Sequence, residues 1–261
     1  MADKVTAPKI RGMKTSGNKV VCLTAYDAYF GRLADESGVD LILVGDSMAN
    51  VVLGYPNTVP LTLEETVHHV RAVRRGVSRA LLVADLPFGS YNASVEQAVN
   101  SAVELMKAGA ESVKLEGDYS EAIEAMVKAG IPVMGHVGMT PQSVNNFGGF
   151  RVQGKGDAGD DVLRKAKSVE EAGAFSIVLE VIPSALSKRI TEALQIPTIG
   201  IGAGPDCDGQ IQVFHDALGL SRETFRHAKK FVEGEQLLLQ GIKDYACEVR
   251  NESFPTAENS F

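Results

Sequence analysis

Short apolar runs rich in valine, isoleucine and leucine recur along the chain, and each is followed by a polar turn. Eight of these runs have the length of strands: residues 20–25, 41–46, 80–85, 112–117, 132–138, 175–182, 197–204 and 211–217. A continuous apolar run between turns is typical of a strand that is buried on both faces, as in a parallel sheet. The pattern therefore predicts eight buried parallel strands.

Stretches between these runs have the apolar spacing of helices. They include residues 94–110, 120–130 and 160–174, and several end in an Ala-Gly pair, where glycine suits the left-handed residue that closes a helix. Strands that alternate with helices form right-handed βαβ units. Eight units predict an α/β fold, a closed (β/α)8 TIM barrel, with only a loop between the last two strands. We expect residues 1–261 to form one such domain with short N-terminal and C-terminal extensions.

Carboxylates stand at the ends of three neighbouring predicted strands. Asp46 ends the second, Asp85 the third and Glu116 the fourth. The carboxyl ends of TIM-barrel strands form the active site, so these like charges would be crowded, which raises pKa values or requires a cation. Hard oxygen ligands of this kind suit an ion such as Mg²⁺. The alternative is that Asp46 and Asp85 are turn residues or helix caps.

Lys114 lies two residues before Glu116, so the two side chains share one face of the strand. A lysine beside carboxylates is either part of a structural ion pair or an active-site cation. It could form a Schiff base with a carbonyl substrate, or bind a substrate carboxylate as a point charge. The predicted metal site favours the second role, because a metal ion already polarises the carbonyl.

Two further ionisable residues end the fifth and sixth strands. Glu180 comes directly after an apolar run, and a carboxylate in that position is a candidate general base. It could instead form a salt bridge to a neighbouring loop. His136 could be a catalytic helper, although a single histidine is more often a structural polar residue than a catalytic one.

Composition and net charge limit the kinds of partner and the cellular location that we expect for this protein. The net charge of −7 and the pI of about 5.3 argue against nucleic acid or an anionic membrane, which select basic surfaces. The N-terminus is too polar for a secretory signal, and no apolar run approaches the length of a membrane span. Cys22, Cys207 and Cys247 show no Cys-x-x-Cys spacing, so neither disulfides nor a zinc site is expected. These features predict a cytoplasmic protein.

Several long motifs are more specific than these single residues. They are GDSMANVVLGYPNTVPLTLEE (45–65), ADLPFGSY (84–91), VKLEG (113–117), GIPVMGHVGMTPQSV (130–144), GGFRVQGK (148–155) and IPTIGIGAGPDCDGQIQVFHDALGL (196–220). Together they closely resemble the ketopantoate hydroxymethyltransferase family, from about Ile10 to Pro255.

The resemblance implies transfer of a hydroxymethyl group from 5,10-methylenetetrahydrofolate to 3-methyl-2-oxobutanoate, which gives 2-dehydropantoate in pantothenate and coenzyme A biosynthesis. It also implies one Mg²⁺ per subunit, small molecules as partners, and assembly into a homodecamer. The site residues that it implies are the metal ligands Asp46, Asp85 and Glu116, the substrate contacts Asp46, Ser47, Asp85 and Lys114, the proton acceptor Glu180 and the nearby His136.

The residues and the resemblance lead to one hypothesis. Glu180 removes a proton from the oxo acid, the resulting enolate is stabilised by Mg²⁺, and Lys114 and Ser47 hold the substrate carboxylate. One alternative is a metal-dependent lyase or aldolase that acts on a 2-oxo acid without folate. Another is a barrel that only binds a small acid, although ionisable groups clustered at one end of the barrel count against it.

Overall fold

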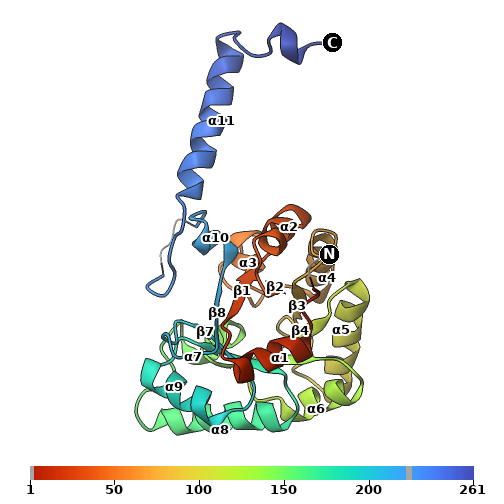
Figure 1. Cartoon of the computed structure of the whole chain (residues 1–261), viewed down its shortest axis with the longest axis vertical. Helices are drawn as coiled ribbons and strands as arrows, with labels where there is room; N and C mark the ends of the chain where they lie inside the picture. The colour runs from red at the N-terminus through yellow and green to blue at the C-terminus, as the bar shows by residue number, and fades with distance from the viewer. Residues whose placement is uncertain (1–2, 222–224) are drawn as a thin grey trace. The chain divides into compact units, whose positions relative to one another are not determined.

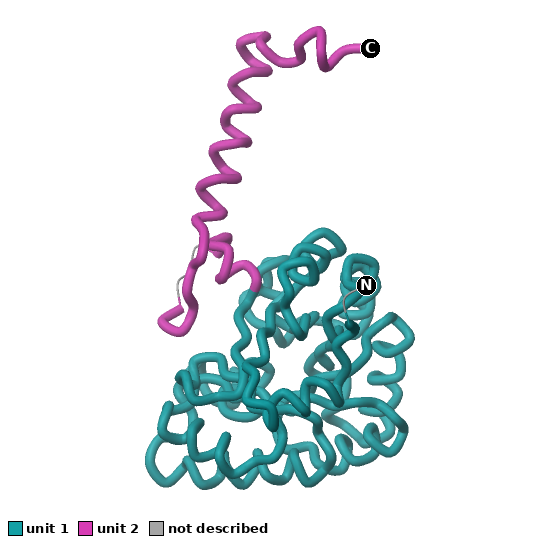
Figure 2. The backbone as a smooth tube through the Cα atoms, in the orientation of Figure 1, with its two compact units in different colours: residues 1–213 teal, residues 214–261 magenta. Residues whose placement is uncertain are grey.

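The computed structural model describes residues 3–221 and 225–261, and it separates into two compact units, Met1–Val213 and Phe214–Phe261 (Figure 2). In the first unit, eight parallel strands follow one another in chain order around a closed ring. Helices lie outside this ring (Figure 1). The prediction of a (β/α)8 TIM barrel is confirmed. The grouping of the whole chain into one domain with short extensions stays a prediction.

The barrel elements alternate along the chain. The strands are β1 (Val20–Thr24), β2 (Leu41–Val44), β3 (Leu81–Asp85), β4 (Ser112–Lys114), β5 (Val133–Gly138), β6 (Ser176–Glu180), β7 (Thr198–Ile201) and β8 (Gly209–Gln212). The helices are α1 (Ala7–Ser16), α2 (Ala28–Glu36), α3 (Met48–Val51), α4 (Leu63–Arg74), α5 (Val95–Ala108), α6 (Ser120–Lys128), α7 (Val144–Phe147), α8 (Ala158–Glu171) and α9 (Ser184–Ala193), with the 3₁₀ helix η1 (Pro141–Ser143).

The second unit is helical. It contains α10 (Phe214–Ala217), α11 (Gly234–Arg250) and the 3₁₀ helix η2 (Ala257–Asn259). Across the described ranges of both units, every helix is too short or too polar to cross a membrane.

The sequence pattern located the strands well and their ends less well. The runs in β2 and β3 are buried at every position, as expected for strands covered by helices outside and by core residues inside. The predicted eighth strand was wrong in its position, because β8 ends at Gln212 and Phe214–Ala217 forms a helical turn. A short apolar run does not by itself distinguish a strand from a buried helical turn.

One apolar cluster fills the barrel interior. It joins residues of the strands to three residues at the start of the chain, Val5, Ala7 and Ile10, two of which belong to α1. Its strand members include Val20, Leu41, Leu81, Val83, Met134, Val178, Ile199 and Ile211. The packed interior leaves the carboxyl ends of the strands as the place where polar side chains gather.

The seam between β8 and β1 requires a glycine. Gly209 pairs with Val20 of β1 and with Ile199 of β7. A Cβ atom at this position would lie 2.4 Å from the Val20 carbonyl oxygen and 2.8 Å from Cδ1 of Ile199. The strands can approach so closely only because residue 209 has no side chain.

We therefore expect Gly209→Ala to lower the free energy of unfolding by about 1–3 kcal/mol, the usual cost of overpacking. Urea denaturation would measure the change. Gly12→Ala is the matched control, since Gly12 lies in α1 and, among the described residues, no atom beyond its chain neighbours and the nearby backbone of α1 lies within 4 Å of its would-be Cβ. The control should be neutral or up to about 1 kcal/mol more stable. Equal stability of Gly209→Ala and wild type would contradict the tight seam.

Candidate active site

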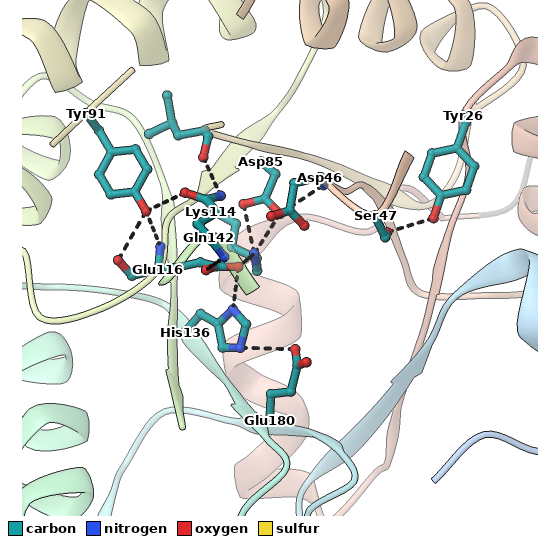
Figure 3. Close-up of polar contacts among 11 residues, drawn as sticks. Tyr26, Asp46, Ser47, Asp85, Tyr91, Lys114, Glu116, His136, Gln142 and Glu180 are labelled. Carbon is teal, nitrogen blue, oxygen red and sulfur yellow. Dashed lines mark hydrogen bonds and ion pairs between the residues drawn. The ribbon is translucent and has the colours of Figure 1, made fainter. Parts of the chain in front are cut away.

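Charged side chains gather at the carboxyl ends of the strands because of the strand period (Figure 3). Side chains two apart on a strand point to the same side. In β3, Leu81 and Val83 belong to the interior cluster and Asp85 ends the strand in the same phase. In β6, Val178 belongs to that cluster and Glu180 ends the strand in the same phase. The strand faces that pack the core therefore also carry Asp85 and Glu180.

Three carboxylates come together in this site. Asp46, Asp85 and Glu116 each offer an oxygen atom, and these atoms all lie within 4.8 Å of one another. The three residues are 5%, 1% and 3% exposed. Burial, together with the charges of Glu116 and Asp85, raises the pKa of Asp46 well above its ordinary value. Burial also raises the pKa of Asp85, although Lys114 opposes it. The cluster needs positive charge to stay ionised.

Lys114 supplies part of that positive charge. Its Nζ donates to both Asp85 carboxylate oxygens, at 2.8 and 2.7 Å, and lies 3.8 Å from Glu116 Oε1. Burial lowers the pKa of Lys114, but Asp85, Glu116 and Asp46 outweigh it and raise the pKa above its ordinary value. Lys114 is therefore a buried ammonium ion and a poor nucleophile.

Two oxygens of the cluster lack a donor. Among the described residues, none donates a hydrogen bond to Asp46 Oδ2 or to Glu116 Oε1, although both atoms are buried. A buried carboxylate oxygen without a donor is costly unless another group compensates for it. Together with Asp85, these oxygens form a hard, anionic donor set that fits a divalent cation such as Mg²⁺.

His136 lies between two carboxylates (Figure 3). Its Nδ1 is 3.4 Å from Glu116 Oε1 and its Nε2 is 3.3 Å from Glu180 Oε2, without hydrogen-bond geometry in either case. Burial and the charge of Lys114 lower the pKa of His136, but Glu116 and Glu180 outweigh them and raise it to about 9. Burial raises the pKa of Glu116, but His136 and Lys114 outweigh it and hold that pKa below its ordinary value.

Ser47 follows Asp46 in the turn between β2 and α3. Its Oγ is 2.8 Å from the hydroxyl of Tyr26, a buried residue in the loop between β1 and α2. His69 Nδ1 lies 2.7 Å from the Tyr26 carbonyl oxygen. Ser47 is therefore positioned by contacts with a different loop of the same barrel end.

The backbone next to Glu180 adopts an uncommon conformation. Val181 has a φ of 47°, in the left-handed region that β-branched residues rarely occupy. Its N–H donates to the Ile201 carbonyl at 2.8 Å, and its own carbonyl accepts from the Gln153 N–H at 3.0 Å. The Glu180 carbonyl accepts from Met139 at 2.8 Å. These bonds fix the sharp turn that directly follows Glu180.

The structure adds Tyr91 and Gln142, which sequence reasoning did not single out. The Tyr91 hydroxyl donates to Gln142 Oε1 at 2.7 Å, and the Gln142 backbone N–H donates to Glu116 Oε2 at 3.0 Å. Both residues are buried. Each belongs to a long motif, ADLPFGSY or GIPVMGHVGMTPQSV, yet no local spacing in either motif points to Glu116.

Nearly the whole chain matches one family model, and relatives with the same enzyme name are similar to it over almost their full length. Residues 4–257 match the family model described as ketopantoate hydroxymethyltransferase. The 3-methyl-2-oxobutanoate hydroxymethyltransferase of Syntrophus aciditrophicus is 52% identical over 263 residues, which cover 99% of this chain and 97% of the relative. The enzyme of the same name from Thermotoga maritima is 49% identical over 257 residues, which cover 97% and 95%.

Solved structures share the fold at low sequence identity. Phosphonopyruvate hydrolase has a TM-score of 0.64 at 15% identity, covering 98% of this chain and 91% of that structure. 2,3-dimethylmalate lyase, a member of the PEP mutase/isocitrate lyase superfamily, has a TM-score of 0.62 at 14% identity, with coverage of 98% and 91%. At these identities the similarity establishes the barrel fold and carries no argument about the reaction.

We expect His136 to be protonated at neutral pH in the metal-free protein, because its pKa is raised from 6.5 to about 9. Since the folded-state value is the higher one, protonation stabilises the fold fully below pH 6.5, and this contribution is lost as the pH rises through about 9. NMR titration of the imidazole signals in chelator would measure the pKa. His136→Gln identifies the signal, and titration near 6.5 would contradict the expectation.

Proposed function

This chain belongs to the ketopantoate hydroxymethyltransferase family, and we propose that its buried carboxylates, Lys114 and Glu180 form the site of the transfer reaction. The chain is an enzyme of pantothenate biosynthesis that transfers a hydroxymethyl group to 3-methyl-2-oxobutanoate, which gives 2-dehydropantoate. The one-carbon donor that we propose is 5,10-methylenetetrahydrofolate. The strongest support from the structure is that three buried carboxylates share one barrel end with Glu180, and that two of them have an oxygen to which no described residue donates a hydrogen bond.

Asp46, Asp85 and Glu116 are the residues that would hold one Mg²⁺ per subunit. When bound, the ion would polarise the keto oxygen of the oxo acid and stabilise the negative charge that develops there. The residues fit this role because their oxygens are close together, buried and anionic. Burial also excludes water, which strengthens every electrostatic interaction in the site.

Lys114 and Ser47 would hold the substrate carboxylate. Lys114 remains an ammonium ion because three carboxylates surround it, so it can attract an anion but cannot attack a carbonyl carbon. Ser47 has a hydroxyl group in contact with Tyr26. Asp46 and Asp85 complete the contacts with the substrate. This arrangement orients the oxo acid so that its C3 hydrogen can face the base.

Glu180 would act as the general base. It lies at the end of β6, 3.3 Å from His136 Nε2, and its side chain is 15% exposed, so a substrate can reach it. Removing the C3 proton gives an enolate, whose C3 then attacks the one-carbon unit of the folate. The oxygen of a water molecule then bonds to the transferred carbon, the bond from that carbon to the folate nitrogen breaks, and this nitrogen takes up a proton as tetrahydrofolate leaves. His136 would assist by holding the Glu180 carboxylate in place.

Assembly and location are further parts of the proposal. Membership of the family supports a homodecamer, and the net charge of −7 supports small-molecule partners rather than nucleic acid. The biosynthetic role supports a cytoplasmic location. Sedimentation velocity would distinguish a decamer from a smaller assembly.

We expect product from 3-methyl-2-oxobutanoate and methylenetetrahydrofolate in the presence of Mg²⁺, none after chelation, and recovery when Mg²⁺ is restored. The reason is that the carboxylates repel one another without a cation. Mass spectrometry of 2-dehydropantoate would measure turnover. Full activity in chelator, with no metal by elemental analysis, would contradict the metal site. Turnover of the oxo acid without folate would favour a lyase or aldolase, and ion binding without any turnover would favour a binding-only barrel.

We expect Glu180→Gln to lower the rate of proton abstraction by about 10²- to 10⁴-fold, which is the usual contribution of a positioned general base. Glutamine keeps the size of the side chain but cannot accept the proton. Exchange of the C3 hydrogen for deuterium, followed by NMR, isolates this step, and a folate analogue without a transferable carbon can be added if exchange is slow.

Glu192→Gln is the matched control, because Glu192 is an exposed residue of α9. It should exchange at the wild-type rate, whereas Glu180→Gln should not. Exchange at the wild-type rate in Glu180→Gln would exclude Glu180 as the base and make His136 the next candidate.

A further inference from the structure

Hydrogen bonds join Glu116, Tyr91 and Gln142, and a further one joins Gln142 to Leu86 (Figure 3). The Glu116 N–H donates to the Tyr91 hydroxyl at 3.4 Å, and this hydroxyl donates to Gln142 Oε1 at 2.7 Å. The Gln142 side chain donates from Nε2 to the Leu86 carbonyl at 3.0 Å. The Gln142 backbone N–H donates to Glu116 Oε2 at 3.0 Å. The bonds among Glu116, Tyr91 and Gln142 thus form a ring that starts at the Glu116 backbone and returns to its carboxylate, and the bond to Leu86 lies outside this ring.

The two carboxylate oxygens of Glu116 have different hydrogen-bond partners. Oε2 accepts the Gln142 N–H, whereas Oε1 accepts no hydrogen bond from the described residues and is one of the oxygens that face Lys114 and His136. A carboxylate held through one oxygen cannot rotate freely about its last side-chain bond. Its other oxygen, Oε1, then keeps both of its lone pairs for a cation.

We propose that Tyr91 and Gln142 are positioning residues, which hold Glu116 so that Oε1 is presented to the divalent cation. The proposal rests on the proposed metal site and adds to it two residues that are not among the three clustered carboxylates. Hydrogen-bond partners behind a metal ligand orient it and tune its affinity for the ion.

Gln142 suits this role because both ends of its amide are engaged. Its Oε1 and Nε2 bond to the loop after β3, through Tyr91 and Leu86, which fixes η1 against that loop. The backbone N–H that contacts Glu116 belongs to the same residue, so its direction depends on these two bonds. All of these residues are buried, so water cannot replace a lost partner cheaply.

The test is Tyr91→Phe, which removes one oxygen atom and leaves the ring in place. The substitution leaves Gln142 Oε1 without its donor and the Glu116 N–H without its acceptor. We expect the dissociation constant of Mn²⁺, measured without substrate from the EPR signal of the free ion, to rise about 10- to 100-fold. The Mg²⁺ concentration for half-maximal turnover should rise by a similar factor, and turnover should recover at saturating Mg²⁺.

Tyr119→Phe is the matched control. Tyr119 packs edge-to-face on Tyr91 at 5.1 Å between ring centroids, but its hydroxyl accepts from Asn92 and contacts none of the carboxylates. It should bind Mn²⁺ like the wild type. Gln142→Leu is a second variant that keeps bulk and removes both amide bonds, and it should weaken Mn²⁺ binding as Tyr91→Phe does.

The outcomes separate this inference from the proposed function. If the wild type and both variants bind Mn²⁺ equally, the positioning role is wrong and the metal site stands. If the variants lose only thermal stability while their ion affinity is unchanged, the residues are merely structural and the inference is overturned. If the wild type binds no Mn²⁺, the metal site is wrong and this inference falls with it.

Discussion

The repulsion among three buried carboxylates is the constraint on which the site depends. With their oxygens within 4.8 Å, each pair costs about 3–4 kcal/mol at an effective dielectric constant of about 20. Lys114 offsets one of the three negative charges, which leaves two, the charge of one divalent cation. Without the cation, burial and the neighbouring carboxylates raise the pKa of Asp46, and Glu116 and Glu180 raise the pKa of His136, so these two groups hold their protons more tightly. The acidic cluster therefore accounts for both the expected metal and the unusual titration of its neighbours.

The charged side chains of the site lie at the carboxyl ends of the strands, away from the apolar core of the barrel. Apolar residues from α1 and the strands pack the interior, while the same strand faces carry Asp85 and Glu180 at their carboxyl ends. Strand residues are held by the sheet itself. Asp46 and Gln142 lie on connecting segments, and so their positions depend on hydrogen bonds, such as that from Gln142 to Leu86. The strained Val181 shows the same need for fixed geometry directly beside Glu180.

The carboxylates of the site have similar chemistry and lie close together, but the groups around each one differ. Burial and neighbouring carboxylates raise the pKa of Asp46, whereas His136 and Lys114 hold that of Glu116 low. Glu180 is the most exposed carboxylate of the group and contacts only His136 among these residues. Such differences allow neighbouring carboxylates to divide ligand and base roles in one site. The division comes from which charges and donors lie nearby, and not from the residue type.

The amino-acid sequence by itself determined that strands alternate with helices in a closed barrel and that acids stand at or just after the apolar runs, because such a run and the residue that follows it are local features. It also carried the motifs by which the family is recognised. Only the tertiary structure decided that Asp46 Oδ2 and Glu116 Oε1 have no donor within residues 3–221 and 225–261, that β8 ends before Phe214, and that Tyr91 bonds to Gln142, 51 residues away. Contacts between separate loops leave no spacing in the sequence, because the folded barrel and not the local chain brings those loops together.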